Sequence, residues 1–158
     1  MIRSARIDEL GLLTDLMHRS KAVWGYDEDF MAAARVVLQV SAEDVESGQL
    51  VVFDLDGPQG LCKLVVDGGV AEIDKLFVAP EGMGKGVGRA LVQWAIETAL
   101  AQDAMRIEIE ADPGAVPFYQ RMGAHEIGCV LSEAIAGRML PLMQIDLSDL
   151  APGGLRSI

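Results

Sequence analysis

The segment from residue 76 to residue 91 constrains the fold of this chain more than any other part of its sequence. An apolar stretch that ends at Pro80 is followed by a turn rich in glycine and then by the first turn of an amphipathic helix. Glycines leave the backbone N–H groups of such a turn uncovered, at the positive end of the helix dipole. The segment therefore predicts a strand, a loop that binds an anion, most often a phosphate group, and a helix.

The spacing of the glycines excludes two common families of phosphate-binding loop. A Walker A loop places Ser or Thr directly after its lysine, whereas Lys85 is followed by a glycine. A dinucleotide-binding fingerprint reads Gly-x-Gly-x-x-Gly, and its last glycine would fall on Arg89 or on Val87. The pattern that remains is Met83-x-x-Gly86-x-Gly88.

This remaining pattern resembles the pyrophosphate-binding motif of the GNAT superfamily of acyl-CoA-dependent N-acetyltransferases, which usually reads Gln/Arg-x-x-Gly-x-Gly/Ala. Residues 112–124, which contain the pair Phe118-Tyr119, are similar to the second signature of that family. The two blocks follow one another in the family's order within residues 70–125. The resemblance implies a GNAT-like α/β fold with one mixed sheet, in the order β-α-α-β-β-β-α-β-α-β-β, and acetyl-CoA as the co-substrate.

Hydrophobic periodicity places strands and helices in that same order. Helical spacing predicts helices that start at Asp8, near Asp27 or Asp29, and after the glycine loop, and residues 41–44 begin a helix or a turn. We expect a single domain over residues 1–150 and a mobile tail over residues 151–158. Alternating apolar residues predict strands at 2–7, 50–55, 60–66, 70–78, 106–111, 124–131 and 140–147, and a short helix is predicted at 117–122.

Composition and charge argue against several classes of protein. The net charge of −11 argues against nucleic-acid binding, which needs a basic face. Acidic residues precede any long apolar run, and no run approaches the length of a membrane span, so we expect no signal peptide, no membrane association and a cytoplasmic location. His18 and His125 are isolated, which predicts no metal site. Cys62 and Cys129 are both expected to be reduced thiols in the core.

Tyr119 is the strongest candidate for a catalytic side chain, and its role is implied by the resemblance. It falls where the family often carries the general acid that protonates the departing CoA thiolate, and a packing role for its ring is the alternative. Glu72 is the candidate general base, because it lies 11 positions before Met83, the offset of the catalytic glutamate in histone-acetylating members. Asp74 shares a face with Glu72 if the strand has a period of two, and it is a rival or a helper. Catalysis through water, with Glu72 as an outward-facing structural carboxylate, stays open.

The other candidates are binding residues that the resemblance supplies. Trp24 and Tyr26 lie between the first two helices, where the family builds its acceptor pocket, and their rings could hold a cationic amine or act as structural staples. Lys85 and Arg89 could contact phosphates or be solvated charges at a helix start. The residues expected to bind the cofactor are Leu76, Phe77, Val78, Met83, Gly84, Lys85, Gly86, Val87, Gly88 and Arg89.

The resemblance implies an N-acetyltransferase that moves an acetyl group from acetyl-CoA to a primary amine by direct attack in a ternary complex. The expected acceptor is a small-molecule or peptide amine, and a homodimer is a possible assembly by family analogy alone. Two departures favour a different class, a non-catalytic acyl-CoA-binding or interaction module on the same fold. Met83 replaces the usual Gln or Arg, and Asp112 replaces a frequent Asn with a carboxylate that would repel a phosphate.

Overall fold

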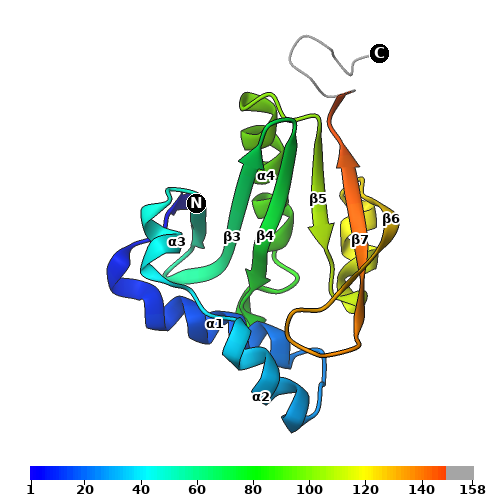
Figure 1. Ribbon diagram of the computed structural model, residues 1–158. Coiled ribbons are helices and arrows are strands. Elements are labelled where there is room, and N and C mark those ends of the chain that lie inside the picture. The colour runs from blue at the N-terminus through cyan, green and yellow to red at the C-terminus, as the bar shows by residue number, and fades with distance from the viewer. Residues whose placement is uncertain (149–158) are drawn as a thin grey trace.

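One mixed sheet runs through the molecule, and helices cover both of its faces (Figure 1). The computed structural model describes residues 1–148, so the predicted domain end at residue 150 and the predicted tail at 151–158 lie outside the described residues. The strands are β1 (Ile2–Ser4), β2 (Leu50–Asp54), β3 (Pro58–Asp67), β4 (Val70–Val78), β5 (Arg106–Glu110), β6 (His125–Leu131) and β7 (Met139–Asp146). The helices are α1 (Leu10–Ala22), α2 (Glu28–Val37), α3 (Ala42–Glu46), α4 (Val87–Ala101) and α5 (Val116–Arg121), and the 3-10 turns are η1 (Ile7–Glu9), η2 (Pro80–Gly82) and η3 (Pro113–Ala115).

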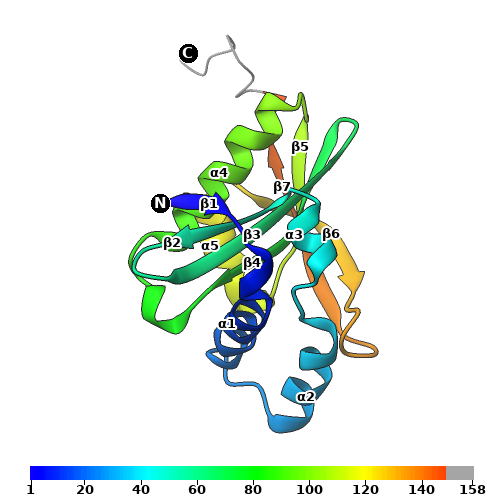
Figure 2. The same ribbon diagram turned by 90° about the vertical axis from the view of Figure 1, so that its left-hand side faces the viewer.

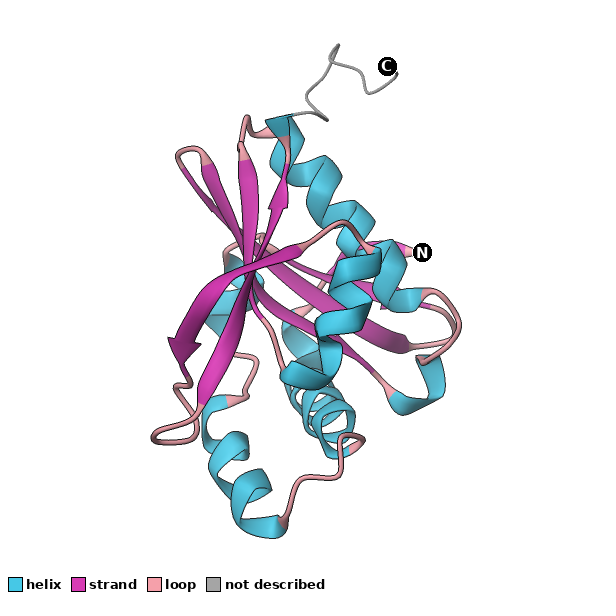
Figure 3. Cartoon of the chain, turned by 90° about the vertical axis from the view of Figure 1, so that its right-hand side faces the viewer, coloured by secondary structure: helices cyan, strands magenta, loops and turns pink. Residues whose placement is uncertain are grey.

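The strands of the sheet stand in the order β1-β2-β3-β4-β5-β7-β6. Neighbouring strands pair antiparallel, except that β4 and β5 are parallel. A parallel pair needs a crossover connection, and the glycine loop and α4 provide it. The predicted α/β class is confirmed, and α3 is the element that begins at residues 41–44. Figure 3 shows the twist of this sheet and the helices packed against it.

Successive side chains of the strands point alternately into two hydrophobic cores, one on each face of the sheet. In β2, Leu50 and Val52 face the core that α1 covers, whereas Val51 faces the core that α4 covers. Helices α3 and α4 lie on opposite sides of β3 in Figure 2. Helix α1 buries Leu13, Leu16 and Met17 on one face, and α4 buries Val87, Leu91, Val92 and Ala95 on the other.

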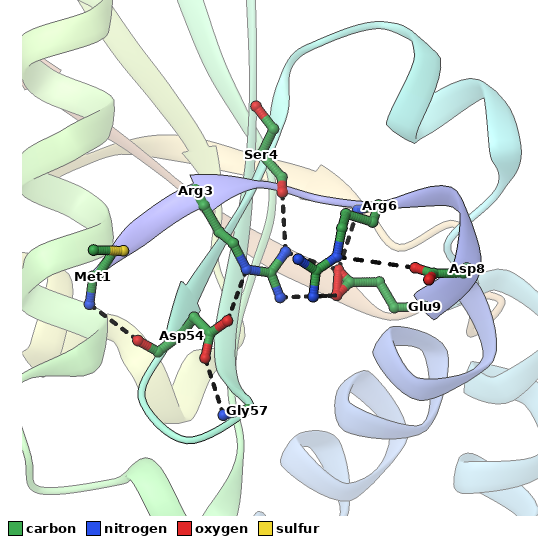
Figure 4. Close-up of polar contacts among 8 residues, drawn as sticks. All are labelled: Met1, Arg3, Ser4, Arg6, Asp8, Glu9, Asp54 and Gly57. Carbon is green, nitrogen blue, oxygen red and sulfur yellow. Dashed lines mark hydrogen bonds and ion pairs between the residues drawn. The ribbon is translucent and has the colours of Figure 1, made fainter.

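The first strand is shorter than predicted, because an arginine ties the following turn to the sheet. Arg3 donates to both carboxylate oxygens of Glu9 and, through Nε, to Asp54 at 2.8 Å (Figure 4). The strand predicted over residues 2–7 therefore ends early, and Asp8 lies inside η1 rather than capping α1. The hydrogen bond from Arg3 outweighs burial and holds the pKa of the Glu9 carboxyl below its ordinary value.

The two cysteines differ in their surroundings. Cys62 is fully buried in β3, as predicted, and burial raises the pKa of its thiol to about 12. Cys129 is exposed, so the prediction of a core thiol is wrong at this position. The reason is that β6 is an edge strand of the sheet and is exposed along almost its whole length. An apolar strand pattern does not distinguish an edge strand from a central one.

Candidate active site

The parallel strands β4 and β5 part from one another halfway along β4. Their ladder ends at the pair Ile73–Ile109, although β4 continues to Val78 (Figure 1). Past this pair, the edge of β4 that faced β5 has no strand partner within the described sheet. Alternate backbone N–H and C=O groups of residues 75–78 therefore face the space between the two strands.

A β-bulge marks the position where the strands part. Lys75 of β4 pairs with Lys63 of β3, and Ile73 pairs with Leu64, the residue that follows Lys63. Asp74 is therefore the extra residue of the bulge. The regular alternation of faces that the sequence predicts for Glu72 and Asp74 is thus interrupted at Asp74. Both carboxylates are nevertheless exposed, and both line the same cavity.

The glycine loop between β4 and α4 presents unpaired backbone donors. Gly84 and Gly86 have φ of 76° and 81°, a left-handed conformation that favours glycine, and Gly86 is the N-cap of α4. A Cβ atom on Gly88 would lie 3.2 Å from the ring of Phe118, so glycine lets α5 approach α4 closely. The N–H groups of the loop and first helical turn that donate to no atom of residues 1–148 are those of Gly84, Gly86, Val87, Gly88 and Arg89.

A cavity of about 770 Å³ joins this loop to the parted strands. It is bounded by α1, α2, β4, the glycine loop, α5 and the β6–β7 loop. Lys85 and Tyr26 do not line it, and the exposed Trp24 lines it while its ring packs against Gly114. The other candidate residues that line it are Glu72, Asp74, Leu76, Phe77, Val78, Met83, Gly84, Gly86, Val87, Gly88, Arg89 and Tyr119.

Tyr119 is enclosed by protein but reaches the cavity. Its side chain is only 6% exposed, and burial raises the pKa of its hydroxyl. The hydroxyl makes no hydrogen bond within residues 1–148. In that part of the chain, Gln59 Oε1 is the only side-chain N or O atom that is both fully enclosed and without a hydrogen-bond partner, so the Tyr119 hydroxyl is not fully enclosed. The phenol is therefore protonated at neutral pH and free to donate a hydrogen bond into the cavity.

Carboxylates gather on the side of the cavity where β4 and β5 part. Glu72 comes from β4, Glu110 from the end of β5 and Glu133 from the β6–β7 loop. Burial, and then the charge of Glu110, raise the pKa of Glu72, while burial and then Glu133 raise that of Glu110. Asp74 differs from these residues because Lys75 Nζ lies 2.9 Å from its Oδ2 atom.

Asp112 anchors a polar network between elements that are far apart in the sequence. Its Oδ2 atom lies 2.7 Å from both Lys21 Nζ and the Tyr26 hydroxyl, and its Oδ1 atom accepts from the N–H of Gly114. Arg138 donates to the Tyr26 hydroxyl at 2.8 Å. Burial would raise the pKa of Asp112, but the hydrogen bonds from Lys21, Tyr26 and Gly114 hold it below its ordinary value. The charge predicted to repel a phosphate is thus neutralised within the protein.

Several cavity residues were absent from the sequence-based candidates. Lys21, Glu110, Glu133 and Arg138 belong to no recognisable motif, and long-range contacts alone bring them together. The sequence did contain a signal for Glu110. This residue ends a strand with alternating apolar residues and directly follows a buried isoleucine, just as Glu72 directly precedes a buried isoleucine in β4.

Within residues 1–148, no group of three His, Cys, Asp or Glu side chains is arranged to hold a metal ion. None of the helices in that part of the chain is both long enough and apolar enough to cross a membrane.

Comparison with known proteins places this geometry in a family. The model described as the acetyltransferase (GNAT) family matches residues 13–124. An uncharacterised N-acetyltransferase of Methanocaldococcus jannaschii is 40% identical over 60 residues, which make up 36% of this chain and 26% of that protein. The chain thus matches about a quarter of the length of this curated relative.

Solved structures share the fold at low sequence identity. A GCN5-related N-acetyltransferase from Rhodopseudomonas palustris superposes with a TM-score of 0.76 at 22% identity, over 93% of this chain and 95% of that one. The PaiA N-acetyltransferase of Thermoplasma acidophilum, solved in complex with coenzyme A, gives 0.74 at 16% identity, over 92% and 98% of the two chains. Since the family model spans most of the sequence, the chain belongs to the GNAT acetyltransferase family.

Proposed function

We propose that this protein is an N-acetyltransferase that moves an acetyl group from acetyl-CoA to a primary amine by direct attack in a ternary complex. One observation carries the proposal: a single cavity joins the unpaired N–H groups of the glycine loop to the parted strands and to the enclosed Tyr119. Acetyl-CoA would supply the activated acetyl thioester. The acceptor would be a small-molecule or peptide amine.

The backbone of the glycine loop and of β4 would hold the co-substrate. The free N–H groups at the start of α4 suit a pyrophosphate, because they combine unpaired donors with the positive end of the helix dipole. Gly86 leaves room for that approach, because a Cβ atom there would have open space around it. The unpaired edge of β4 at Leu76, Phe77 and Val78 offers hydrogen bonds to amide and carbonyl groups of the co-substrate.

Tyr119 would act as the general acid and Glu72 as the general base. Burial keeps the Tyr119 hydroxyl protonated, so it can donate its proton to the departing thiolate sulfur. The raised pKa of Glu72 suits removal of a proton from an ammonium group, directly or through water. Asp74 is the rival base, but the hydrogen bond from Lys75 occupies one of its oxygens.

The alternative is a non-catalytic acyl-CoA-binding or interaction module. Met83 favours it, because it offers no hydrogen-bonding side chain and is 37% exposed beside the loop. Asp112 favours it less once its charge is paired with Lys21. The cytoplasmic location, the homodimer and the acceptor-binding roles of Trp24 and Tyr26 stay predictions.

Calorimetric titration with acetyl-CoA tests the binding step. We expect micromolar-range affinity for the wild type and its loss in Gly86→Glu, because a carboxylate would then face the pyrophosphate. Gly48→Glu is the matched control: Gly48 also has a positive φ, of 74°, but it lies outside the cavity. If both variants bind as the wild type does, the loop is not the cofactor site.

Turnover of an accepted amine tests the catalytic step. Tyr119→Phe removes the hydroxyl alone, so kcat should fall by about 10²–10⁴-fold while the affinity for acetyl-CoA stays unchanged. An unchanged kcat would remove Tyr119 from the mechanism. Binding of acetyl-CoA without turnover of any amine would favour the non-catalytic alternative.

A further inference from the structure

Three carboxylates on the acceptor side of the cavity have no cationic partner. Glu72, Glu110 and Glu133 form no ion pair within residues 1–148, although all three line the cavity. Glu72 and Glu110 come from adjacent strands at the end of their shared ladder, and their side chains lie on the sheet face opposite the buried Ile73 and Ile109. The structure thus concentrates negative charge where the strands open.

Three of the cations that line the same cavity, Lys21, Lys75 and Arg138, are already engaged. Lys21 and Arg138 are held by Asp112 and by the Tyr26 hydroxyl, at distances of 2.7 and 2.8 Å. Lys75 bonds to Asp74.

Arg89 and Arg121 line the cavity from the start of α4 and the end of α5, and they form no ion pair with the three glutamates within residues 1–148. No cation of the described chain forms an ion pair with the three glutamates. Burial first, and then the charges of the neighbouring carboxylates, raise the pKa of Glu72 and Glu110.

A second observation points to a ligand in the cavity that the glutamates line. Tyr119 is nearly enclosed, and its hydroxyl donates to no described residue while keeping contact with the cavity. A polar group this deeply buried is normally hydrogen-bonded. Its free donor is thus available for a molecule that enters the cavity, which the three glutamates also line.

We propose that the acceptor is an aliphatic diamine or polyamine, with the reacting amine at Glu72 and a second ammonium group held by Glu110 and Glu133. This inference rests on the proposed N-acetyltransferase function. A second positive charge would offset the repulsion among the three carboxylates, and each ammonium donates three hydrogen bonds to acceptor oxygens. A monoamine of the same length would leave Glu110 and Glu133 unpaired.

Steady-state thiol release with matched amines tests the proposal. The probes are putrescine and butylamine, which have four-carbon chains and differ in the second amine, with spermidine as a longer polyamine. We expect kcat/KM for putrescine or spermidine to exceed that for butylamine by about tenfold or more, because the second ammonium group adds charge-assisted hydrogen bonds to carboxylates. Equal acceptance of mono- and diamines would overturn the inference and leave the acetyltransferase proposal intact.

Two variants and one control locate the second ammonium group. Glu110→Gln and Glu133→Gln should each raise KM for the diamine by about tenfold with kcat nearly unchanged, since they remove binding that does not change during the reaction. Neither variant should alter KM for butylamine. Glu97→Gln, on the exposed face of α4 outside the cavity, should match the wild type with every amine. If the control raises KM as much as the two variants do, the effect is one of overall charge and the assignment fails.

Calorimetric titration of the cofactor-free protein with putrescine separates this inference from the proposed function. Putrescine binding that Glu110→Gln weakens would support the site even if acetyl-CoA did not bind. If acetyl-CoA binds but no putrescine or spermidine is acetylated, the inference is wrong and the non-catalytic alternative gains support.

Discussion

Asp112 illustrates how the effect of one carboxylate depends on its partners. Taken alone, a negative charge near a phosphate site is unfavourable, which is why Asp112 was one of the two sequence features that favoured the non-catalytic alternative. In the fold, Lys21, Tyr26 and Gly114 each donate to this carboxylate. The network joins α1, the α1–α2 loop and the start of η3, and Arg138 adds the β6–β7 loop through Tyr26. Asp112 therefore positions the walls of the acceptor side.

The two thiols should differ sharply in reactivity. Cys129 is exposed, whereas Cys62 is buried and has a pKa raised to about 12, which suppresses the reactive thiolate. Titration with a chromogenic disulfide should therefore detect one thiol per native chain and both thiols in denaturant. Cys129→Ser should abolish the native signal. A rapid native reaction that persists in Cys129→Ser would mean that β3 opens readily.

At the scale of elements, short sequence patterns predicted the features that depend on neighbouring residues in the chain. The limits of β4, residues 70–78, agree with the prediction, because turn residues bound an apolar run on both sides. The glycine loop and Tyr119 were identified from short motifs. The bulge at Asp74 was not predicted. A β-bulge is defined by comparison with the partner strand, so the sequence of β4 alone does not show which residue is the extra one. Pairs such as Arg138 with Tyr26 are separated by 112 residues and depend on the whole fold.

The contact between β3 and α4 should tolerate no added methyl group. A Cβ atom on Gly60 would lie 2.7 Å from Val87 Cγ1 and 2.9 Å from Leu91 Cδ1, so Gly60→Ala should destabilise the protein by about 1–3 kcal/mol. Gly11→Ala is the matched control, because Gly11 lies in α1 with no atom within 4 Å of its added Cβ. It should stabilise the protein by about 0.5–1 kcal/mol, since alanine favours a helix.

Urea unfolding of the two glycine variants measures both effects on one scale. Unfolding midpoints that move in opposite directions are expected. If Gly60→Ala unfolds at the wild-type midpoint, β3 and α4 are less closely packed than described.

At the scale of the whole molecule, acidic residues outnumber basic ones, 24 to 13. Several of the cations form ion pairs that hold elements of the fold together. These pairs are Arg3 with Glu9, Lys63 with Asp44 and Lys21 with Asp112. Glu72, Glu110 and Glu133 are left unpaired at the cavity. The uneven distribution of cations, more than the net charge itself, makes one part of the molecule suited to a cationic ligand.

This distribution predicts how stability depends on pH. The folded-state pKa values of Glu72 and Glu110 lie above the ordinary value of 4.5, so above pH 4.5 the folded state binds more protons than the unfolded state. These two groups therefore lower the free energy of unfolding as pH rises through that window. Glu9, Asp44 and Asp112 act in the opposite sense, because their pKa values are lowered and their stabilisation is lost on acidification.

The double variant Glu72→Gln/Glu110→Gln isolates the first effect. Its free energy of unfolding should match that of the wild type near about pH 4, where both glutamates are largely protonated, and exceed it increasingly toward about pH 7. Urea unfolding at several pH values measures the difference, with Glu97→Gln correcting for the loss of a negative charge elsewhere. A difference that stays constant, or that narrows as pH rises, would mean that neither burial nor repulsion raises the pKa of the two carboxyls in the folded protein. A widening difference in the free protein that disappears when putrescine is added would connect the uncompensated charge of Glu72 and Glu110 directly to the proposed ammonium site.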